Sequence, residues 1–161
     1  MTIKTQLNRT DYINATLAFR YSRTSAKIIT AFGILLAGYM VYLTIIIPDQ
    51  VDYSIFIMPA IIIVLPLVSS YLMATLNYKS NGRMSEPMEY VFSDDYLSIK
   101  GESFTTQFTW EKIYKVTQTN NWLFIWQNRI HANPIPKQSL TSDDIKELKT
   151  ILDYHQVKNR L

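Results

Sequence analysis

Few residues in this sequence have the types and spacing that catalysis or metal binding requires. Asp94 and Asp95 are adjacent carboxylates, which could bind a cation or share acid–base work. Neighbouring residues of a strand point to opposite faces, so this pair would not converge on one ligand. Ser93 precedes the pair, and a Ser-Asp-Asp sequence is typical of a turn. We therefore interpret Asp94 and Asp95 as turn residues.

Histidine and cysteine chemistry is equally sparse. The chain has two histidines, His131 and His155, and no cysteine, which excludes disulfides, thiolate nucleophiles and cysteine-bound metals. His131 lies near Arg129 on an expected strand, and no serine, aspartate or cysteine stands at the spacing of a known catalytic motif. The sequence predicts a protein that is not an enzyme, with no catalytic residues, no cofactor and no bound metal.

Three tryptophans, Trp110, Trp122 and Trp126, could stack on a ligand. Large aromatic side chains also supply much of the core of a small domain, and they are frequent at bilayer surfaces. We interpret the three as core or bilayer-surface residues.

The elements that would position any site are dominated by two uncharged runs, 28–47 and 55–76, separated by the short connector 48–54. A bilayer core is crossed by roughly 20 apolar residues of helix, and each run is that long. Neither run has a polar face, so we predict a transmembrane hairpin over 28–76. A cleaved signal peptide would have a shorter apolar run and a small-residue cleavage site, and a second run would not be expected to follow it.

The charges that flank the hairpin predict its orientation. The connector contains Asp49 and Asp52 and no Lys or Arg, whereas both outer flanks are basic. The positive-inside bias places both termini in the cytoplasm. The basic residues could also hold a specific lipid or a nucleic acid, but topology and headgroup contact explain them, and we predict no nucleic-acid partner. The flanking basic residues expected to contact the membrane surface are Arg20, Arg23, Lys27, Lys79 and Arg83.

Small residues inside the two runs are candidates for close helix packing. Gly33 and Ala37 are one helical turn apart in the first run, and Ser70 and Ala74 are one turn apart in the second. Such pairs let helix backbones approach closely in lipid. They also arise by chance in apolar segments, so we name these four residues only as packing candidates.

The segment before the hairpin predicts a strand and then an amphipathic helix. Apolar and polar residues alternate over Thr2–Leu7, and either Asn8 or Thr10 can cap a following helix that runs to the membrane. A lone strand is not stable in water. Since a hairpin returns the chain to the same side of the membrane, we predict that Ile3–Leu7 joins the C-terminal sheet as an edge strand, with Ile3 and Leu7 facing its core.

Beyond a polar linker at 77–87, the hydrophobic period changes to two, which indicates strands. Gly101-Glu102 predicts a two-residue hairpin turn with glycine first. The expected strands are Met88–Phe92, Tyr96–Lys100, Phe104–Trp110, Glu111–Thr119, Trp122–Gln127 and Ile130–Ile135, with Trp122–Gln127 central because both of its faces are apolar.

The last expected element is a helix over Ser142–Val157. Thr141 and Asp144 have the spacing of a capping box. Apolar residues lie on one stripe of this helix, and the stripe must cover a sheet. The sequence therefore predicts an α+β membrane protein, in which a small antiparallel sheet is packed by a C-terminal helix.

Several segments, taken in order, resemble the YcxB-like family of bacterial proteins. The resemblance implies two membrane spans and a small C-terminal domain like a pleckstrin-homology (PH) fold, located at the bacterial cytoplasmic (inner) membrane. It implies no catalytic residues, and the C-terminal segment shows six strands where a PH fold has seven. The matching segments are Leu7–Tyr12, the hydrophobic hairpin, Phe92–Tyr96, Phe108–Ile113 and Ile135–Lys137.

The predicted organisation is an N-terminal strand and helix at 1–27, the hairpin at 28–76, the linker at 77–87 and a cytoplasmic PH-like domain at 88–161. Two function classes are consistent with it. In the first, the cytoplasmic domain of an anchored module binds a protein or lipid partner. In the second, the hairpin of an immunity or accessory subunit pairs with a membrane-active toxin or transporter. The lipid bilayer is a partner in both classes, a second protein is expected, and self-association is left open.

Overall fold

A computed structural model describes residues 1–161, apart from the side chain of Gln50. The chain divides into two compact units. One unit contains Met1–Ala15 and Tyr78–Leu161, and the other contains Thr16–Asn77. The second unit, which we call the hairpin unit, therefore interrupts the first, which we call the folded unit.

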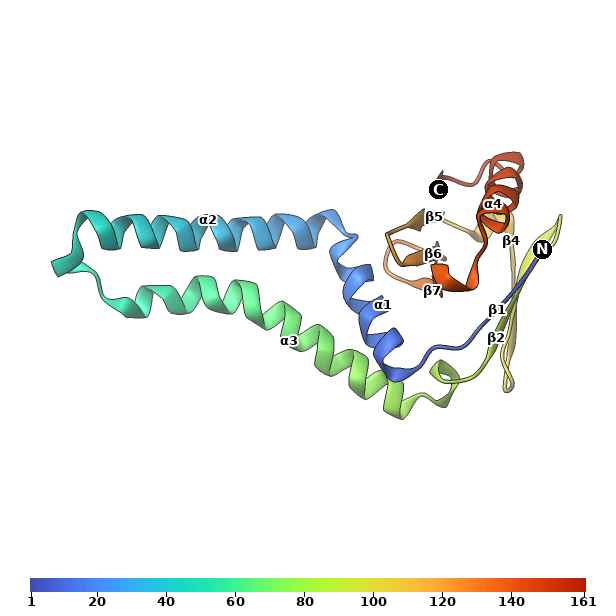
Figure 1. Cartoon of the computed structure of the whole chain (residues 1–161), viewed down its shortest axis with the longest axis horizontal. Coiled ribbons are helices and arrows are strands. Elements are labelled where there is room, and N and C mark those ends of the chain that lie inside the picture. Colours follow the sequence, from blue (N-terminus) through green and yellow to red (C-terminus); the bar gives the residue numbers. More distant parts are fainter. The chain divides into compact units, whose positions relative to one another are not determined.

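The hairpin unit consists mainly of two long antiparallel helices, α2 (Thr24–Ile46) and α3 (Ile57–Ser80), drawn side by side in Figure 1. Two 3-10 turns, Pro48–Gln50 and Tyr53–Phe56, connect them. Helix α3 continues to Ser80 and so includes the first residues of the segment expected to be a linker. The hydroxyl of Tyr78 donates a hydrogen bond to the Leu7 carbonyl at 3.2 Å, which gives this extra turn a tertiary partner inside the folded unit.

Helix α1 (Arg9–Tyr21) begins in the folded unit and ends in the hairpin unit. Of the two expected cap residues, Asn8 is the one used. Its side-chain oxygen accepts the Asp11 N–H at 2.8 Å, and this bond satisfies a backbone donor that the first turn leaves free. The helix ends before Thr24, where α2 begins, so the amphipathic and apolar helices are separate elements.

The first sheet of the folded unit is antiparallel, with the order β1-β2-β3-β4. Its edge strand β1 pairs with β2, and Ile3 lies opposite Tyr90. The side chains of Ile3 and Leu7 are both buried. The predicted addition of the N-terminal strand to the C-terminal sheet is thus confirmed, but the strand ends at Thr5, so Leu7 is buried outside it and does not belong to the core cluster that contains Ile3. The strands are β1 (Thr2–Thr5), β2 (Met88–Phe92), β3 (Tyr96–Lys100) and β4 (Thr105–Thr109).

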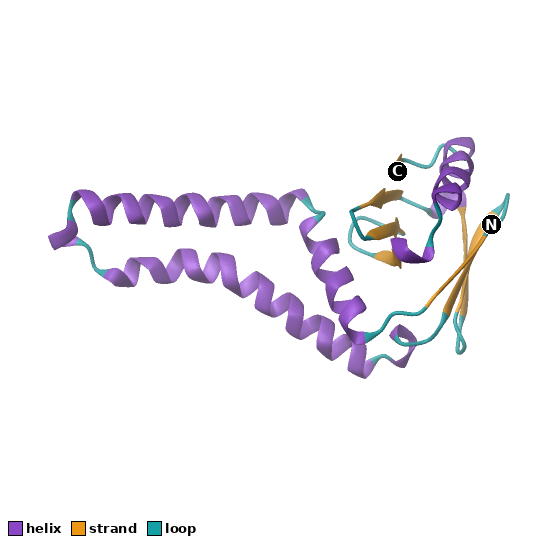
Figure 2. Cartoon of the chain, viewed as in Figure 1, coloured by secondary structure: helices purple, strands orange, loops and turns teal.

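The second sheet has the order β7-β6-β5-β8. Strand β6 is central, as its apolar faces predict, and all five of its side chains are buried. Strand β8 pairs in parallel with β5, placing Asn159 opposite Val116. The strands are β5 (Lys115–Gln118), β6 (Trp122–Trp126), β7 (Ala132–Pro136) and β8 (Asn159–Arg160), and the C-terminal helix is α4 (Ser142–Tyr154). Figure 2 shows the strands in two groups, with α4 beside them.

One hydrophobic cluster joins both sheets and α4. Leu97 from the first sheet, Leu123 from the second and Leu148 from α4 are all fully buried in it. The α+β class, the antiparallel pairing and the packing of the C-terminal helix are confirmed. The expectation of one sheet is wrong, because the strands form two four-stranded sheets.

The division into two sheets has its cause at Trp110. Strand β4 ends at Thr109, and a 3-10 turn (Trp110–Lys112) occupies the place where the expected strands Phe104–Trp110 and Glu111–Thr119 would have met. The Trp110 side chain is buried, its ring stacks on Phe92 at 6.4 Å, and its indole N–H donates to the Ser93 carbonyl at 3.2 Å. Burying this ring against β2 directs the chain away from the first sheet.

The end of α4 also differs from expectation. The helix stops at Tyr154 rather than Val157, since Gln156 adopts a positive φ of 56°. The Val157 N–H then donates to the Leu152 carbonyl at 2.8 Å, a bond that closes the helix end. The reversal lets Asn159–Arg160 pair with β5, a strand that the sequence pattern did not reveal.

Gly101 has a different role from the one expected. The Gly101 N–H donates to the Phe104 carbonyl at 2.9 Å, so the turn is centred on Glu102-Ser103. No glycine in the described chain has a positive φ. A methyl group at Gly101 would lie 2.5 Å from the Phe104 ring and 2.7 Å from a Glu86 carboxylate oxygen. Glycine is therefore required here for space and not for its backbone conformation.

Candidate functional site

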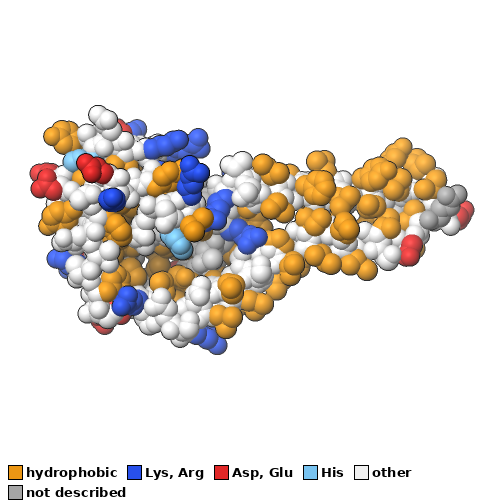
Figure 3. Space-filling model, turned by 180° about the vertical axis from the view of Figure 1, so that it is seen from behind, with side chains coloured by type: hydrophobic (Ala, Val, Ile, Leu, Met, Phe, Trp, Pro, Cys, Tyr) orange, Lys and Arg blue, Asp and Glu red, His pale blue; other side chains and the backbone are white. Residues whose placement is uncertain are grey.

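The most distinctive surface of the described chain is the apolar exterior of the hairpin unit. Within the most apolar 18-residue window of each helix, only 6% of the residues are buried in α2 and 11% in the segment Tyr53–Ser80. A core helix of a water-soluble protein would bury most of such a surface. Figure 3 shows apolar side chains along both helices. The two helices are long and apolar enough to cross a membrane.

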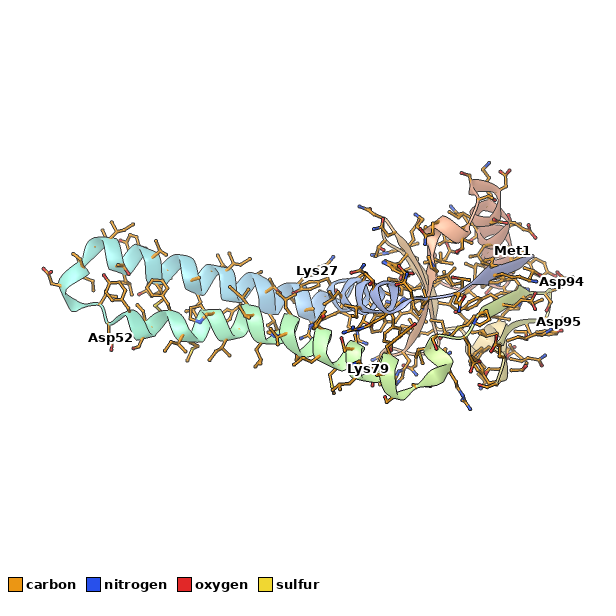
Figure 4. All side chains as sticks on the ribbon, turned by 60° about the horizontal axis from the view of Figure 1, so that its bottom comes forward. Met1, Lys27, Asp52, Lys79, Asp94 and Asp95 are labelled. Atoms are coloured by element: carbon orange, nitrogen blue, oxygen red, sulfur yellow. The ribbon has the colours of Figure 1, made fainter. Side chains whose placement is uncertain are left out.

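Charge is separated along the hairpin unit. Its three basic residues, Arg20, Arg23 and Lys27, precede or begin α2, and its two acidic residues, Asp49 and Asp52, lie in the connector. Figure 4 shows Lys27 and Asp52 at opposite ends of the helix pair. One end of the hairpin is therefore basic and the other acidic.

The predicted basic flank residues differ in their surroundings. Lys27, Lys79 and Arg83 are exposed, whereas Arg20 and Arg23 are half-buried. The Arg23 guanidinium lies 4.5 Å from the centre of the Phe19 ring. Arg83, in the 3-10 turn Gly82–Met84, lies 5.4 Å from the centre of the Phe104 ring. Lys27, Lys79 and Arg83 are therefore the residues of this set with exposed side chains, and Arg83 also contacts an aromatic ring.

Arg20 makes a contact that sequence reasoning missed. Its Nη1 donates to the Ser70 hydroxyl oxygen at 2.8 Å, and the Ser70 hydroxyl donates to the Pro66 carbonyl at 2.7 Å. The contact ties the end of α1 to α3, and no local sequence pattern signals it because the two residues are 50 positions apart.

The four small residues proposed for helix packing differ in how deeply they are buried and in what they contact. Gly33 is buried, and a methyl group there would come within 2.9 Å of both Ile62 and Ile63. Ala37, one turn further, is half-buried. Ser70 and Ala74 are buried on α3. Gly33 thus packs against isoleucines, while Ser70 is engaged by Arg20, so these two small residues do not face each other.

The Gly33 contact also aligns the two helices. Lys27 lies about 9 Å along α2 from Gly33 at 1.5 Å per residue. Because α3 is antiparallel to α2, the part of α3 that lies level with Lys27 is about 9 Å after Ile62 and Ile63 in the sequence direction. That part of α3 is near Ser69 and Ser70, and Ser70 is the residue that Arg20 contacts. The Gly33 contact and the Arg20–Ser70 bond therefore both place the basic end of the hairpin beside Ser70, and we call this height along the helices the basic level. The final apolar residues of the second run, 71–76, extend past this level.

All three tryptophans are buried within the folded unit, and the expected core role is confirmed for Trp110, which belongs to the hydrophobic cluster that joins both sheets and α4. The Trp110 ring stacks on His155 at 5.2 Å, and the ring of Tyr154 meets His155 edge-on at 4.9 Å. On the second sheet, the Lys115 ammonium lies 4.2 Å from the centre of the Trp126 ring, whose indole N–H donates to the Thr117 hydroxyl at 2.8 Å.

The remaining candidate residues do not converge. Asp94 and Asp95 are exposed in the turn between β2 and β3, as predicted, and are labelled in Figure 4. His131 is exposed before β7, where its backbone N–H donates to the Asn128 side chain at 2.9 Å. Among the described residues, no group of three or more His, Cys, Asp or Glu side chains could hold a metal ion.

An open hollow of about 430 Å³ lies across the first residues of β2 and the end of β1. The Lys4 ammonium and a Glu89 carboxylate oxygen approach to 3.5 Å beside it. Sequence reasoning missed this hollow because its two walls come from distant parts of the chain. Its lining residues are Lys4, Thr5, Gln6, Pro87, Met88 and Glu89.

Comparison with known proteins gives one result. No curated protein and no solved structure matches the chain significantly. The family model for YcxB-like protein matches residues 92–152, from the last residue of β2 into α4, and it confirms over this segment the resemblance of the chain to the YcxB-like family.

Proposed function

We propose that this chain is a non-enzymatic membrane-anchored binding module of the bacterial cytoplasmic membrane. In this proposal α2 and α3 insert as a hairpin, and the folded unit binds a protein partner in the cytoplasm. The observation that carries the proposal is the apolar exterior of two adjacent helices that bury only 6% and 11% of their most apolar windows. Exposing this surface to water would be unfavourable by about 25 cal/mol per Å² of apolar area.

Two tyrosines near the ends of the hairpin support insertion. Tyr53 lies in the acidic connector and Tyr71 beside the basic level at Ser70, and both are exposed, as are Tyr39 and Tyr42 of α2 between these ends. The two are separated by about 27 Å of helix, close to the ~30 Å thickness of a bilayer core. Tyrosines are enriched at both surfaces of a membrane. We infer that the bilayer core lies between these residues and that 71–76 enters the headgroup layer.

The arrangement of the folded unit supports the PH-like expectation. With β1 included, seven strands precede α4, divided between two sheets that share one core. Seven strands and a C-terminal helix are what the family resemblance implies. The strand missing from the C-terminal segment is supplied from the other side of the hairpin.

Charge favours a protein over a lipid as the partner of the folded unit. This unit contains 13 Lys and Arg residues and 11 Asp and Glu residues, a formal net charge of +2. Attraction to anionic lipid increases with the number of basic residues near the surface. A nearly balanced unit has little such attraction as a whole, so we assign contact with headgroups to Lys27 of the hairpin unit and to Lys79 and Arg83, the two basic flank residues of the folded unit.

The orientation can be tested with single cysteines, because the chain has none of its own. Asp49→Cys in the connector should react with a membrane-impermeant maleimide on intact cells, and Asp94→Cys should react only after permeabilisation. Both residues are exposed acidic side chains, so each is a matched control for the other. Labelling of Asp94→Cys but not Asp49→Cys on intact cells would overturn the orientation.

The binding role can be tested with a photoreactive amino acid placed in the full chain in cells. Ile130 in the folded unit and Leu65 in α3 are matched positions, exposed by 60% and 59%. A reproducible protein adduct at Ile130 or at the exposed Tyr114 is expected. Adducts confined to Leu65 would instead favour an immunity or accessory subunit that pairs through its hairpin with a membrane-active toxin or transporter.

A further inference from the structure

Strands β5 and β8 bring three basic residues to the same face of the second sheet. In this parallel pair Thr117 lies opposite Arg160, and the Val116 N–H donates to the Lys158 carbonyl at 2.9 Å. The register places Lys115 beside Lys158. Because residues two positions apart on a strand point to the same face, the side chains of Lys115, Lys158 and Arg160 lie together on one face. We call these three residues the basic face.

Burial along the two strands agrees with this assignment of faces. Val116 and Val157 are both buried in the hydrophobic cluster that joins the two sheets and α4. Lys158 and Arg160, which alternate with the buried side of β8, are exposed, and Lys115 is half-buried. The basic face is therefore the side of these strands that is turned away from the core.

No carboxylate neutralises the basic face within the residues that the structure describes, where the ion pairs join other side chains. Asp153 instead accepts a hydrogen bond at 2.7 Å from Asn159, which lies opposite the core residue Val116. Glu111, in the 3-10 turn four positions before Lys115, is exposed and forms no ion pair there either. Like charges on neighbouring strands oppose pairing. An anionic partner would relieve this repulsion.

Lys115 is positioned by aromatic rings and not by a carboxylate. Its ammonium lies 4.2 Å from the centre of the Trp126 ring and 5.6 Å from the centre of the Tyr114 ring. The Trp126 indole N–H donates to the Thr117 hydroxyl at 2.8 Å, which fixes the orientation of the ring. A cation–π contact leaves the positive charge in place, and a side chain that is already ordered loses less entropy on binding. Tyr114 is 46% exposed, so apolar surface is available next to the ammonium.

We propose that the basic face binds an extended acidic segment of the protein partner, with a carboxylate at every second position. This assignment rests on the proposed function, because it names the chemistry of the partner that the folded unit binds. Side chains on one face of an extended segment repeat every ~6.6 Å, which is also the spacing of Lys158 and Arg160 along β8. One carboxylate can therefore meet Lys158 and Lys115 while the next receives two hydrogen bonds from the Arg160 guanidinium. Bilayer headgroups have no such fixed repeat, so the spacing favours a peptide.

Two labelled peptides of the same composition test the spacing. In the peptide ETETETE the glutamates stand two positions apart, and in EETTTEE no two glutamates have that separation. Each carries fluorescein and is titrated with the full chain in neutral detergent, with binding followed by fluorescence anisotropy. ETETETE should bind at least about fivefold more tightly, the effect of one or two additional exposed ion pairs. Equal affinities, or no binding of either peptide, would overturn the proposal.

Two matched charge reversals test the residues. Lys158 and Lys149 are both exposed lysines, and only Lys158 belongs to the basic face. Lys158→Glu should weaken the binding of ETETETE at least about fivefold, and Lys149→Glu should weaken it less than about twofold. Lys158→Glu should melt no lower than the wild type, because it places a carboxylate beside Lys115. Equal binding of the peptide by the two variants would overturn the proposal.

An aromatic photoreactive amino acid at Tyr114 of the full chain in cells separates this assignment from the proposed function. A protein adduct is expected in the wild-type background and with Lys149→Glu, and it should be lost with Lys158→Glu. A protein adduct that is unaffected by Lys158→Glu would overturn the acidic segment and leave the proposed function standing. Adducts to lipid alone, or no protein adduct anywhere in the folded unit, would overturn both.

Discussion

Leu35 and Leu148 have the same side chain in opposite surroundings. Leu35, in α2 of the hairpin unit, is 72% exposed, whereas Leu148, in α4 of the folded unit, is completely buried. The folded unit gathers its apolar residues inside two sheets and a helix, and the hairpin unit turns them outwards. The difference supports the proposal that the folded unit lies in water and the hairpin unit in an apolar solvent.

The largest expected effect comes from truncating the two leucines. Leu148→Ala leaves a cavity in the core, and such substitutions cost roughly 2–5 kcal/mol of unfolding free energy. Leu35→Ala removes a side chain that packs on little protein, and such changes cost within about 0.5 kcal/mol. Chemical unfolding of the full chain in detergent, followed by tryptophan fluorescence, measures both. Equal losses would remove the distinction between the two units.

A lysine substitution at an exposed apolar position of each unit tests the same difference between the hairpin unit and the folded unit. Leu35→Lys places an ammonium group near the middle of the apolar helix, which costs about 2.5–3.5 kcal/mol on insertion scales. The amount of the variant retained in carbonate-washed membranes should fall. Ile130→Lys, at an exposed apolar position of the folded unit, should leave retention unchanged. Full retention of Leu35→Lys would show that this residue does not face lipid.

Two glycines of α2 lie on different faces of the hairpin, one towards α3 and one away from it. Gly33 contacts Ile62 and Ile63, and Gly38 has open space where a side chain would begin. Gly33→Ala overpacks the contact and should destabilise the helix pair by about 1–3 kcal/mol, whereas Gly38→Ala meets open space and should be neutral to slightly stabilising, because alanine has the higher helix propensity. Thermal melts of helical circular dichroism in bilayers measure the difference. Identical melts would indicate that α2 and α3 separate in the membrane.

The smallest expected effect is a pH dependence in α4. Hydrogen bonds from the backbone and hydroxyl of Thr141 lower the pKa of the Asp144 carboxyl below its ordinary value. A lowered folded-state pKa contributes stability above the unfolded-state pKa of about 3.9, and the contribution is lost as pH falls through the folded-state pKa. Asp144→Asn should lower the melting temperature at pH 7, with the gap closing in acid. The exposed turn variant Asp94→Asn, with the same change in charge, should show a smaller gap.

Local patterns predicted most of the individual elements. The ends of β2 and β3 agree with the expected strands because their alternation is bounded by turn residues. The capping box of Thr141 and Asp144 forms as expected, since both of its residues lie within one helical turn. The pairing of β1 followed from a strand that lacked a local partner.

Features that depend on distant contacts could not be predicted in the same way. The separation of the sheets depends on where Trp110 is buried, and β8 depends on a positive φ at Gln156, a residue with no special preference for it. At the candidate site, the sequence identified Arg20 as a basic flank residue but not its bond to Ser70. The alternation of polar and apolar residues is visible within a few neighbouring positions of the sequence, whereas the partner of a side chain can come from a distant segment.

We propose that the hairpin unit lies in lipid and the folded unit in water. Single spin labels at Leu35, Asp52 and Ile130 of the full chain in bilayers test it most directly, through collision rates with oxygen and with a water-soluble nickel complex. Oxygen concentrates in the bilayer core, so the ratio of oxygen to nickel collisions should be highest at residue 35 and low at residues 52 and 130. Equal nickel accessibility at residues 35 and 130 would contradict the account.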